Sequence, residues 1–455
     1  MEMVLEFLRD VLSQPALLIG IMSCIGLIAL KRPFHKVMTG TLKPILGYLM
    51  LAAGAGVIVN NLDPLGKMIE HGFHITGVVP NNEAIVAVAQ KVLGVETMSI
   101  LVVGLLMNLC IARFTKFKYV FLTGHHSLFM ACLMSAVLGT AGLSGMELIL
   151  VGGFLMGAWS AISPAIGQSY TSKVTDGDEI AIGHFGSLGY YLSAWVAQYV
   201  GKAEDSTEDI EIPEKWGFLR DSTLSTALTM IVFYLIAAFA AGSEFVATLS
   251  GDMSPYLYAV MSAMNFAVGV TIVYSGVRMI LGDLIPAFQG IATKIIPNAI
   301  PAVDCAVFFT YAPTAVVLGF ISSFIGGIIG MLILGAVGGV LIIPGLVPHF
   351  FCGATAGIYG NATGGRRGAA VGAFLNGLAI TFLPALALPV LGQLGFQNTT
   401  FGDADFAVIG LVLGNAFEWI GMAGIYGVVV IAALVLIIPN FIKTKGKVIN
   451  YVEEE

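Results

Sequence analysis

Two glycine–histidine pairs stand within strongly apolar stretches of the sequence. They are Gly124-His125, in LTGHH, and Gly183-His184, in AIGHFGSLG. Glycine permits a break in a helix and exposes backbone polar groups there. A neutral imidazole both donates and accepts hydrogen bonds, which suits a polyhydroxyl ligand or a proton relay. We therefore interpret both histidines as candidate ligand-binding groups; the alternative is that each only satisfies a neighbouring polar group.

Acidic and amide side chains provide a second set of candidates. Asp304 lies between prolines in PAVDCAVFFTYAP, and a carboxylate in that setting indicates a broken helix that lines a cavity. Asn82 and Glu83 follow a proline and open the apolar run 84–112, which predicts a helix start with Asn82 as its cap. Amide and carboxylate groups suit bonding to sugar hydroxyls. A helix cap at the lipid headgroups is the alternative.

Other motifs limit the chemistry. The segment GNATGGRRGA (360–369) carries paired arginines; it could approach a phosphate, cover the site as a hairpin or anchor the chain in the cytoplasm. The five cysteines are scattered singly, without the spacing of metal ligands, and no Walker A motif is found. We therefore expect no metal, no cofactor and no ATP hydrolysis by the chain itself.

The composition determines which elements must position these residues. Of 455 residues, 57% are hydrophobic and 11% charged, whereas soluble domains carry about 25% charged residues. Mean hydropathy is +0.91, and apolar runs recur from Pro15 to Pro439. Each run is long enough to cross a bilayer as a helix, and lipid offers no partners for an open sheet edge. The sequence predicts an all-α polytopic membrane protein with roughly ten or eleven crossings.

Basic residues predict the orientation. Lysines and arginines cluster at 31–43, at 113–118 and at 443–447. Cytoplasmic loops carry an excess of these residues, so we place the three clusters inside the cell. One apolar run precedes the first cluster. The expected N-terminus is therefore outside, the C-terminus cytoplasmic, and the number of crossings odd.

The chain divides into five predicted segments. Residues 1–12 form an amphipathic pattern that suits a helix on the membrane surface, or a polar lead-in to the first span. A first membrane half at 13–201 and a second at 222–442 flank an acidic connector at 202–221. The connector is either a docking surface for a soluble partner or a solvated hinge. Residues 443–455 form a cytoplasmic tail.

The two halves show an internal repeat. A glycine precedes a proline by ten residues, and a polar residue follows that proline by eighteen. The two sets are Gly54, Pro64 and Asn82, and Gly276, Pro286 and Asp304. Charge places the copies in opposite orientations, and inverted repeats are typical of transporters with a midplane substrate site between them.

At these residues the chain resembles the ascorbate-type permeases, the IIC subunits, of the bacterial phosphotransferase system. The likeness extends over 15–443. Its most specific pieces are LTGHH (122–126), VTDGDEIAIGH (174–184), GVRMILGDLIPAFQGI (276–291), PAVDCAVFFTYAPTAVVLGF (301–320) and IIPGLVP (342–348).

The resemblance implies a homodimer in the inner membrane, with eleven transmembrane helices in each protomer. It also implies re-entrant hairpins, a core domain and a V-shaped scaffold domain. Substrate would bind between the domains, and movement of the core would carry it across. A separate IIB protein, which receives a phosphoryl group from IIA and carries it on a cysteine, would phosphorylate the sugar. The chain itself would therefore not be an enzyme.

The resemblance also assigns site residues. Its substrate-contacting positions correspond to His125, His184, Asp304 and Gly54. Phe129 and Phe185 stand where the ascorbate permeases have glutamine, and Asn82-Glu83 replaces a Thr-Tyr pair. The expected site is thus more apolar near the histidines and has an additional acid. Since ascorbate is an anion, an added carboxylate disfavours it. Among ascorbate and related sugars or polyols, we expect the substrate to be a neutral compound.

Two other classes of function remain to be compared. A proton-coupled secondary transporter of a small polar solute could use the same histidines and acids as a relay. It would take up unmodified substrate, and an uncoupler would abolish that uptake. A membrane-embedded enzyme would require a nucleophile–base pair or a metal site, and the sequence presents neither motif.

Overall fold

The structure is a computed structural model that describes residues 11, 14–74, 77, 78, 80, 82–177, 179–210, 222–392 and 400–441. The predicted surface helix at 1–12, except for residue 11, and the predicted tail at 443–455 lie outside the described residues.

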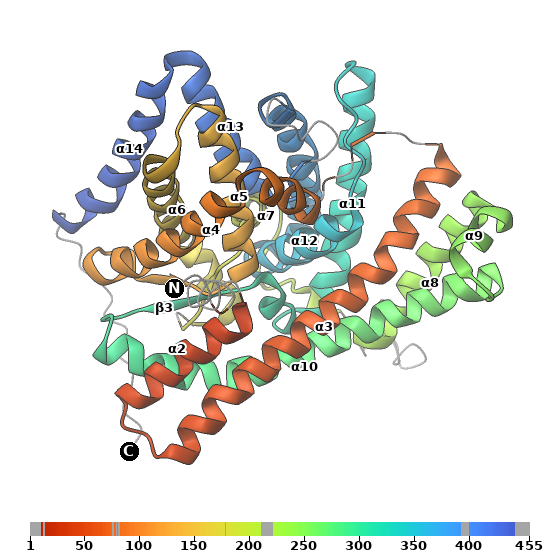
Figure 1. The fold of residues 1–455 in the computed structure, drawn as a ribbon. Coiled ribbons are helices and arrows are strands. Elements are labelled where there is room, and N and C mark those ends of the chain that lie inside the picture. Colours follow the sequence, from red (N-terminus) through yellow and green to blue (C-terminus); the bar gives the residue numbers. More distant parts are fainter. Residues whose placement is uncertain are drawn as a thin grey trace.

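Helices make up most of the described chain (Figure 1). They are α2 (Pro15–Ala29), α3 (Phe34–Phe73), α4 (Asn82–Phe114), α5 (Gly124–Thr140), α6 (Gly145–Thr175), α7 (Ser187–Val200), α8 (Ser222–Ala241), α9 (Ser243–Ser250), α10 (Pro255–Lys294), α11 (Pro313–Ala336), α12 (Leu346–Gly392), α13 (Ala404–Ile420) and α14 (Met422–Phe441), with short 3₁₀ helices η1 (Thr207–Asp209) and η3 (Cys305–Thr310).

Within the described residues, seven helices are long and apolar enough to cross a membrane. The number is eight if α8 and α9, bent by 117°, form one span. The all-helical polytopic prediction is therefore confirmed. The number is below the predicted eleven partly because α12, which consists of two helical segments, is counted as one helix. Gly364 and Gly365 have non-helical backbone angles, and Gly360 packs directly against Gly368, so the chain reverses within α12.

The two longest unbroken helices, α3 and α10, pack against each other. Each has 40 residues. A Cβ added at Gly47 would lie 2.8 Å from the Gly276 carbonyl oxygen, and one at Gly54 would lie 2.7 Å from that of Gly269. Positions rise along α3 as they fall along α10, so the helices are antiparallel, and glycine permits their backbones to touch. In Figure 1 they run side by side at the lower edge, with α2, α8 and α9 around them. We call these five helices the α3–α10 group.

The remaining helices form a second group. α4 packs against α5 and α6, and α12 packs against α7, α11 and α13. Figure 1 shows this second group above the α3–α10 group. Two equally long antiparallel helices are what the predicted inverted repeat requires. The assignment of repeats and domains stays a prediction.

A short parallel sheet lies inside the second group, where the sequence predicted only helices and hairpins. Its strands are β1 (Tyr119–Phe121), β3 (Ile300–Val303) and β2 (Ala181–Ile182), in the order β1-β3-β2. The strands are largely buried, and extended backbone is tolerated at membrane depth where protein covers it. Hydrogen bonds also continue past the strands, from Gly183 N–H to Val303 O at 2.7 Å and from Leu122 N–H to Ala302 O at 2.9 Å.

The described part of the connector, 202–210, is fixed to the helices. The Glu208 carboxylate accepts hydrogen bonds from the Thr314 and Ala315 N–H groups at 3.0 and 3.1 Å, at the start of α11. The Thr207 N–H donates to Asn361 Oδ1 at 2.8 Å. A carboxylate at a helix N-terminus satisfies its free N–H groups and favours its dipole. This part is therefore a helix cap rather than a solvated hinge.

Candidate solute-binding site

Parallel strands bring three of the predicted site residues to one place. β1 leads into Gly124-His125, β2 into Gly183-His184, and β3 into Asp304. Because parallel strands end at the same sheet edge, these residues meet although they lie far apart in the sequence. His125 Nε2 is 3.3 Å from Asp304 Oδ2. A ring nitrogen of His184 also lies within 4.8 Å of the Asp304 carboxylate.

The His125–Asp304 pair faces the α3–α10 group. The Tyr48 hydroxyl, on α3, lies 3.1 Å from His125 Nδ1. The His125 side chain is 38% exposed, whereas that of Asp304 is 9% exposed. Asp304 Oδ1 also accepts the Ala306 N–H at 3.1 Å, which holds the carboxylate at the start of η3. His125 is thus the accessible member, and Tyr48 is a neighbour that the sequence did not single out.

A narrow cavity adjoins this pair, between α2, α3 and α10 on one side and the strand ends on the other. Its lining is apolar except for a tyrosine, a threonine and an aspartate: Ile19, Tyr48, Leu51, Leu122, Thr123, Ile280, Val303, Asp304 and Val307. The predicted carboxylate therefore lies at the boundary between the two helix groups.

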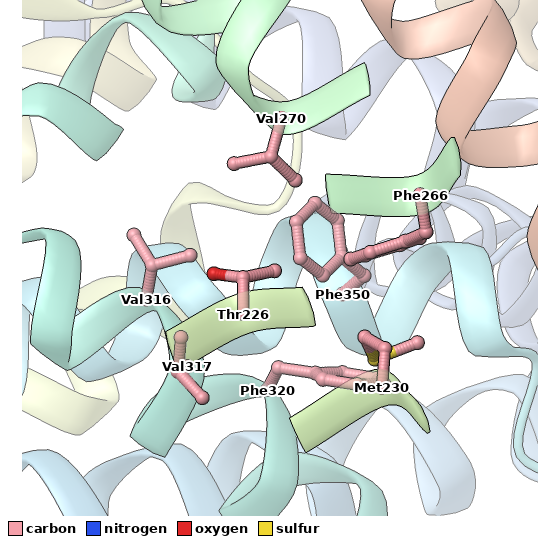
Figure 2. Close-up of a pocket in the computed structure, with 8 residues that line it drawn as sticks. All are labelled: Thr226, Met230, Phe266, Val270, Val316, Val317, Phe320 and Phe350. Atoms are coloured by element: carbon pink, nitrogen blue, oxygen red, sulfur yellow. The ribbon is translucent and has the colours of Figure 1, made fainter. Parts of the chain in front are cut away.

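A second cavity at the same boundary is different. Figure 2 shows it between α8, α10, α11 and α12. Its lining residues are Thr226, Met230, Phe266, Val270, Val316, Val317, Phe320 and Phe350. With one hydroxyl and no ionisable group, it does not suit a hydrophilic solute.

His126 joins the site, although the sequence analysis did not select it. Its ring centroid lies 3.8 Å from that of His184, and its side chain is buried. The Phe185 N–H donates to His126 Nδ1 at 3.3 Å. The second histidine of LTGHH was the available signal. Helical spacing alone does not show which of two adjacent side chains turns inward.

Backbone N–H groups donate to one ring nitrogen of each of two histidines. The Gly186 N–H donates to His184 Nδ1 at 3.2 Å, as the Phe185 N–H does to His126 Nδ1. A nitrogen that accepts a hydrogen bond carries no proton, so we assign the proton of each neutral ring to Nε2. The site thereby combines N–H donors with the Asp304 carboxylate, an acceptor.

The predicted phenylalanines form an aromatic wall behind the histidines. The Phe129 ring meets the His125 ring edge-on at 5.8 Å between centroids. Phe185 is fully buried and stacks on Phe121 at 4.6 Å. Both rings also contact Phe406. Phe185 therefore contributes its backbone N–H and packing from within the core.

Asn82 begins α4, as predicted, and bonds to a segment distant in sequence. Its Nδ2 donates to Asp403 Oδ2 at 2.6 Å, and its Oδ1 accepts the Gly402 N–H at 2.9 Å. Asp403 lies within 4.8 Å of a His184 ring nitrogen. Asn82 thus reaches the histidines through Asp403, which the sequence analysis did not identify. The side chain of Glu83 lies outside the described residues.

Two other predicted features, Gly54 and the Gly-rich segment 360–369, make packing or backbone contacts. Gly54 lies at the α3–α10 crossing, against Gly269 and Val273, and does not line the cavity beside Asp304. Arg366, in the Gly-rich segment, donates its backbone N–H to Asp205 O and its Nε to Ser206 O. These contacts attach Arg366 to the connector.

The fold also gathers possible metal ligands that lie apart in the sequence. His184, Cys352 and Asp403 place donor atoms within 4.8 Å of one another, as do His184, Asp304 and Cys305. However, Cys352 Sγ lies 2.7 Å from Asp403 Oδ1. Sulfur and oxygen ligands about 2.3 and 2.0 Å from a tetrahedral zinc ion lie roughly 3.5 Å apart. The first set therefore fits hydrogen bonding better than zinc coordination.

Comparisons with known proteins identify the family of this chain. The family described as the PTS system sugar-specific permease component (EIIC-GAT) matches residues 10–405. The chain is also similar to the ascorbate-specific PTS system EIIC component of Mycoplasma pneumoniae, with 28% identity over 417 residues. That alignment covers 78% of this chain and 62% of the relative, so the chain spans less than two thirds of the relative's length. The chain belongs to the family of sugar-specific permease components of the phosphotransferase system, and its long apolar helices are those of a multi-pass membrane protein.

Proposed function

We propose that this chain binds a small polyhydroxyl solute at His125, His184 and Asp304 and carries it across the membrane. A separate IIB protein, which receives its phosphoryl group from IIA, then phosphorylates the solute on the cytoplasmic side. The observation that carries the proposal is the meeting of these three side chains at one sheet edge beside the α3–α10 group. Ionisable groups are costly inside a membrane and usually face a cavity or a partner.

The arrangement suits hydroxyl groups. Each hydroxyl donates one hydrogen bond and accepts others, and the site places Nε2–H donors beside a carboxylate acceptor. Binding at the boundary between two helix groups would allow the second group to move against the α3–α10 group. The proposal includes this movement and a homodimer. It also places the N-terminus outside the cell and the C-terminus in the cytoplasm.

Among ascorbate and related sugars or polyols, charge favours a neutral compound. Asp304, Asp403 and Asp405 are all buried near the histidines. An anion would face these carboxylates at low dielectric, where like charges repel strongly. Titration of the purified permease with ascorbate and with sorbitol tests this preference. A markedly tighter affinity for ascorbate would contradict it.

A proton-coupled transporter is the second candidate, because the His125–Asp304 pair could carry a proton. Vesicles containing the permease separate the two mechanisms. Group translocation predicts a phosphate ester inside, only when phosphorylated IIB is present, and no effect of an uncoupler. Accumulation of unmodified solute without IIB, abolished by an uncoupler, would establish the alternative.

A further inference from the structure

A chain of buried polar groups connects Asn82 to His184. Asn82 Nδ2 donates to Asp403, and the other Asp403 oxygen lies 2.7 Å from Cys352 Sγ. Cys352 Sγ is 3.6 Å from the Tyr190 hydroxyl, which is 2.8 Å from His184 Nδ1. Tyr190, Cys352 and Asp403 lie outside the set of residues assigned to solute binding above.

We propose that Cys352 is a positioning residue of the solute site: its thiol joins Asp403 to Tyr190 and so holds His184 with Nε2–H available to the solute. The inference rests on the proposed function, because it assumes that His184 contacts solute. It adds a residue that acts through another rather than on the solute itself.

The protons in this chain have one consistent arrangement. His184 Nδ1 accepts the Gly186 N–H, so it also accepts the single proton of the Tyr190 hydroxyl. The Asp403 carboxylate can only accept, so the Cys352 thiol donates to it. Cys352 Sγ, 3.6 Å from the tyrosine oxygen, is a second acceptor for the same hydroxyl proton.

Removal of the thiol would disturb both neighbours. The partners shown for the Asp403 side chain are the Asn82 amide and this thiol, both neutral. A buried carboxylate that loses one donor seeks another, and the next hydroxyl along this chain of contacts is that of Tyr190, 3.6 Å from the Cys352 sulfur. If its proton turned toward Asp403, His184 Nδ1 would lose the 2.8 Å contact from Tyr190 and keep only the 3.2 Å contact from the Gly186 N–H, so the Nε2–H tautomer would be less strongly favoured.

Cys132 provides a matched control. It is also fully buried, on α5, but it lies in an apolar cluster with residues such as Met130 and Leu133. Truncation of Cys132 removes the same volume as truncation of Cys352. Only the latter breaks the polar chain, so a difference between the two variants reports the hydrogen bonds rather than packing.

The test uses the full-length permease in detergent, labelled with ¹⁵N-histidine. A difference spectrum against His184→Ala identifies the His184 signals. We expect the Nε2–H form in the wild type, a mixture of tautomers in Cys352→Ala, and the wild-type form in Cys352→Ser and Cys132→Ala. Cys352→Val, which fills the volume without a donor, replaces the alanine variant if that variant does not fold.

This readout requires neither solute nor IIB. A result that contradicts the role of Cys352 would therefore leave the proposed function untouched. An unchanged His184 spectrum in Cys352→Ala and Cys352→Val would overturn the proposal. So would equal changes in Cys352→Ala and Cys132→Ala. Stoichiometric zinc in the purified protein, lost on Cys352 substitution, would also overturn it, because the thiol would then be a metal ligand.

Discussion

His125 at the start of α5 and Asp304 at the start of η3 lie in direct contact, with His125 Nε2 3.3 Å from Asp304 Oδ2. Each residue follows a strand of the same small sheet, and Tyr48 approaches the pair from α3. The pair therefore lies where the two groups of helices meet. A solute bound there would contact both groups.

Asp304→Asn should weaken solute binding about 10- to 100-fold, because a hydrogen bond to a charged group contributes about 1.5–3 kcal/mol. Titration calorimetry of the purified protein measures the change. Asp63→Asn is the control, since Asp63 is exposed and pairs with Lys67 one turn away on α3. Wild-type affinity in Asp304→Asn would remove this carboxylate from the site.

His184→Ala should abolish measurable binding while the protein remains folded. His349→Ala is its matched control: His349 is equally buried but bonds to Ser323 Oγ at 2.9 Å, within the α11–α12 contact. We expect the control to bind solute and to unfold at a lower temperature. Equal affinities in the two variants would contradict the role of His184.

Asp405→Ala should destabilise the protein. Its carboxylate accepts hydrogen bonds from Ser187 Oγ at 2.8 Å, the Leu188 N–H at 2.9 Å and Trp159 Nε1 at 3.2 Å. Breaking such a buried network costs about 3 kcal/mol or more. Thermal unfolding in detergent should show a clear fall in the midpoint, whereas an unchanged midpoint would show that these bonds do not hold α7 and α13 together.

Gly54→Ala separates a packing role from a solute-binding role for this glycine. A Cβ there would lie 2.7 Å from the Gly269 carbonyl oxygen, so α3 and α10 must move apart, at a cost of about 1–3 kcal/mol. Gly56→Ala, on the open face of α3, meets no atom within 4 Å and should be neutral. Lost solute binding in Gly54→Ala without lost stability would instead support direct contact with solute.

Glu83→Gln tests the charge that distinguishes this sequence from the ascorbate permeases. If the solute is neutral, the amide should preserve binding within about twofold, since it retains an acceptor and adds donors. Affinity for sorbitol measures the effect. Complete loss of uptake would show that a charge at position 83 is essential.

The sequence alone determined the class of fold and singled out three ionisable residues of the proposed site. Long apolar runs and the scarcity of charge required transmembrane helices. His125, His184 and Asp304 stood out because ionisable side chains are costly in such runs. Both arguments depend on neighbouring residues in the chain, so they needed no knowledge of tertiary contacts.

Only the tertiary structure decided which groups meet. β1, β2 and β3 are too short to be recognised individually, because their stability comes from pairing with one another. The same holds for Tyr48, His126, Cys352 and Asp403, whose surroundings are built from distant elements. Hydrophobicity is a local property of sequence, whereas the choice of a hydrogen-bond partner depends on long-range packing.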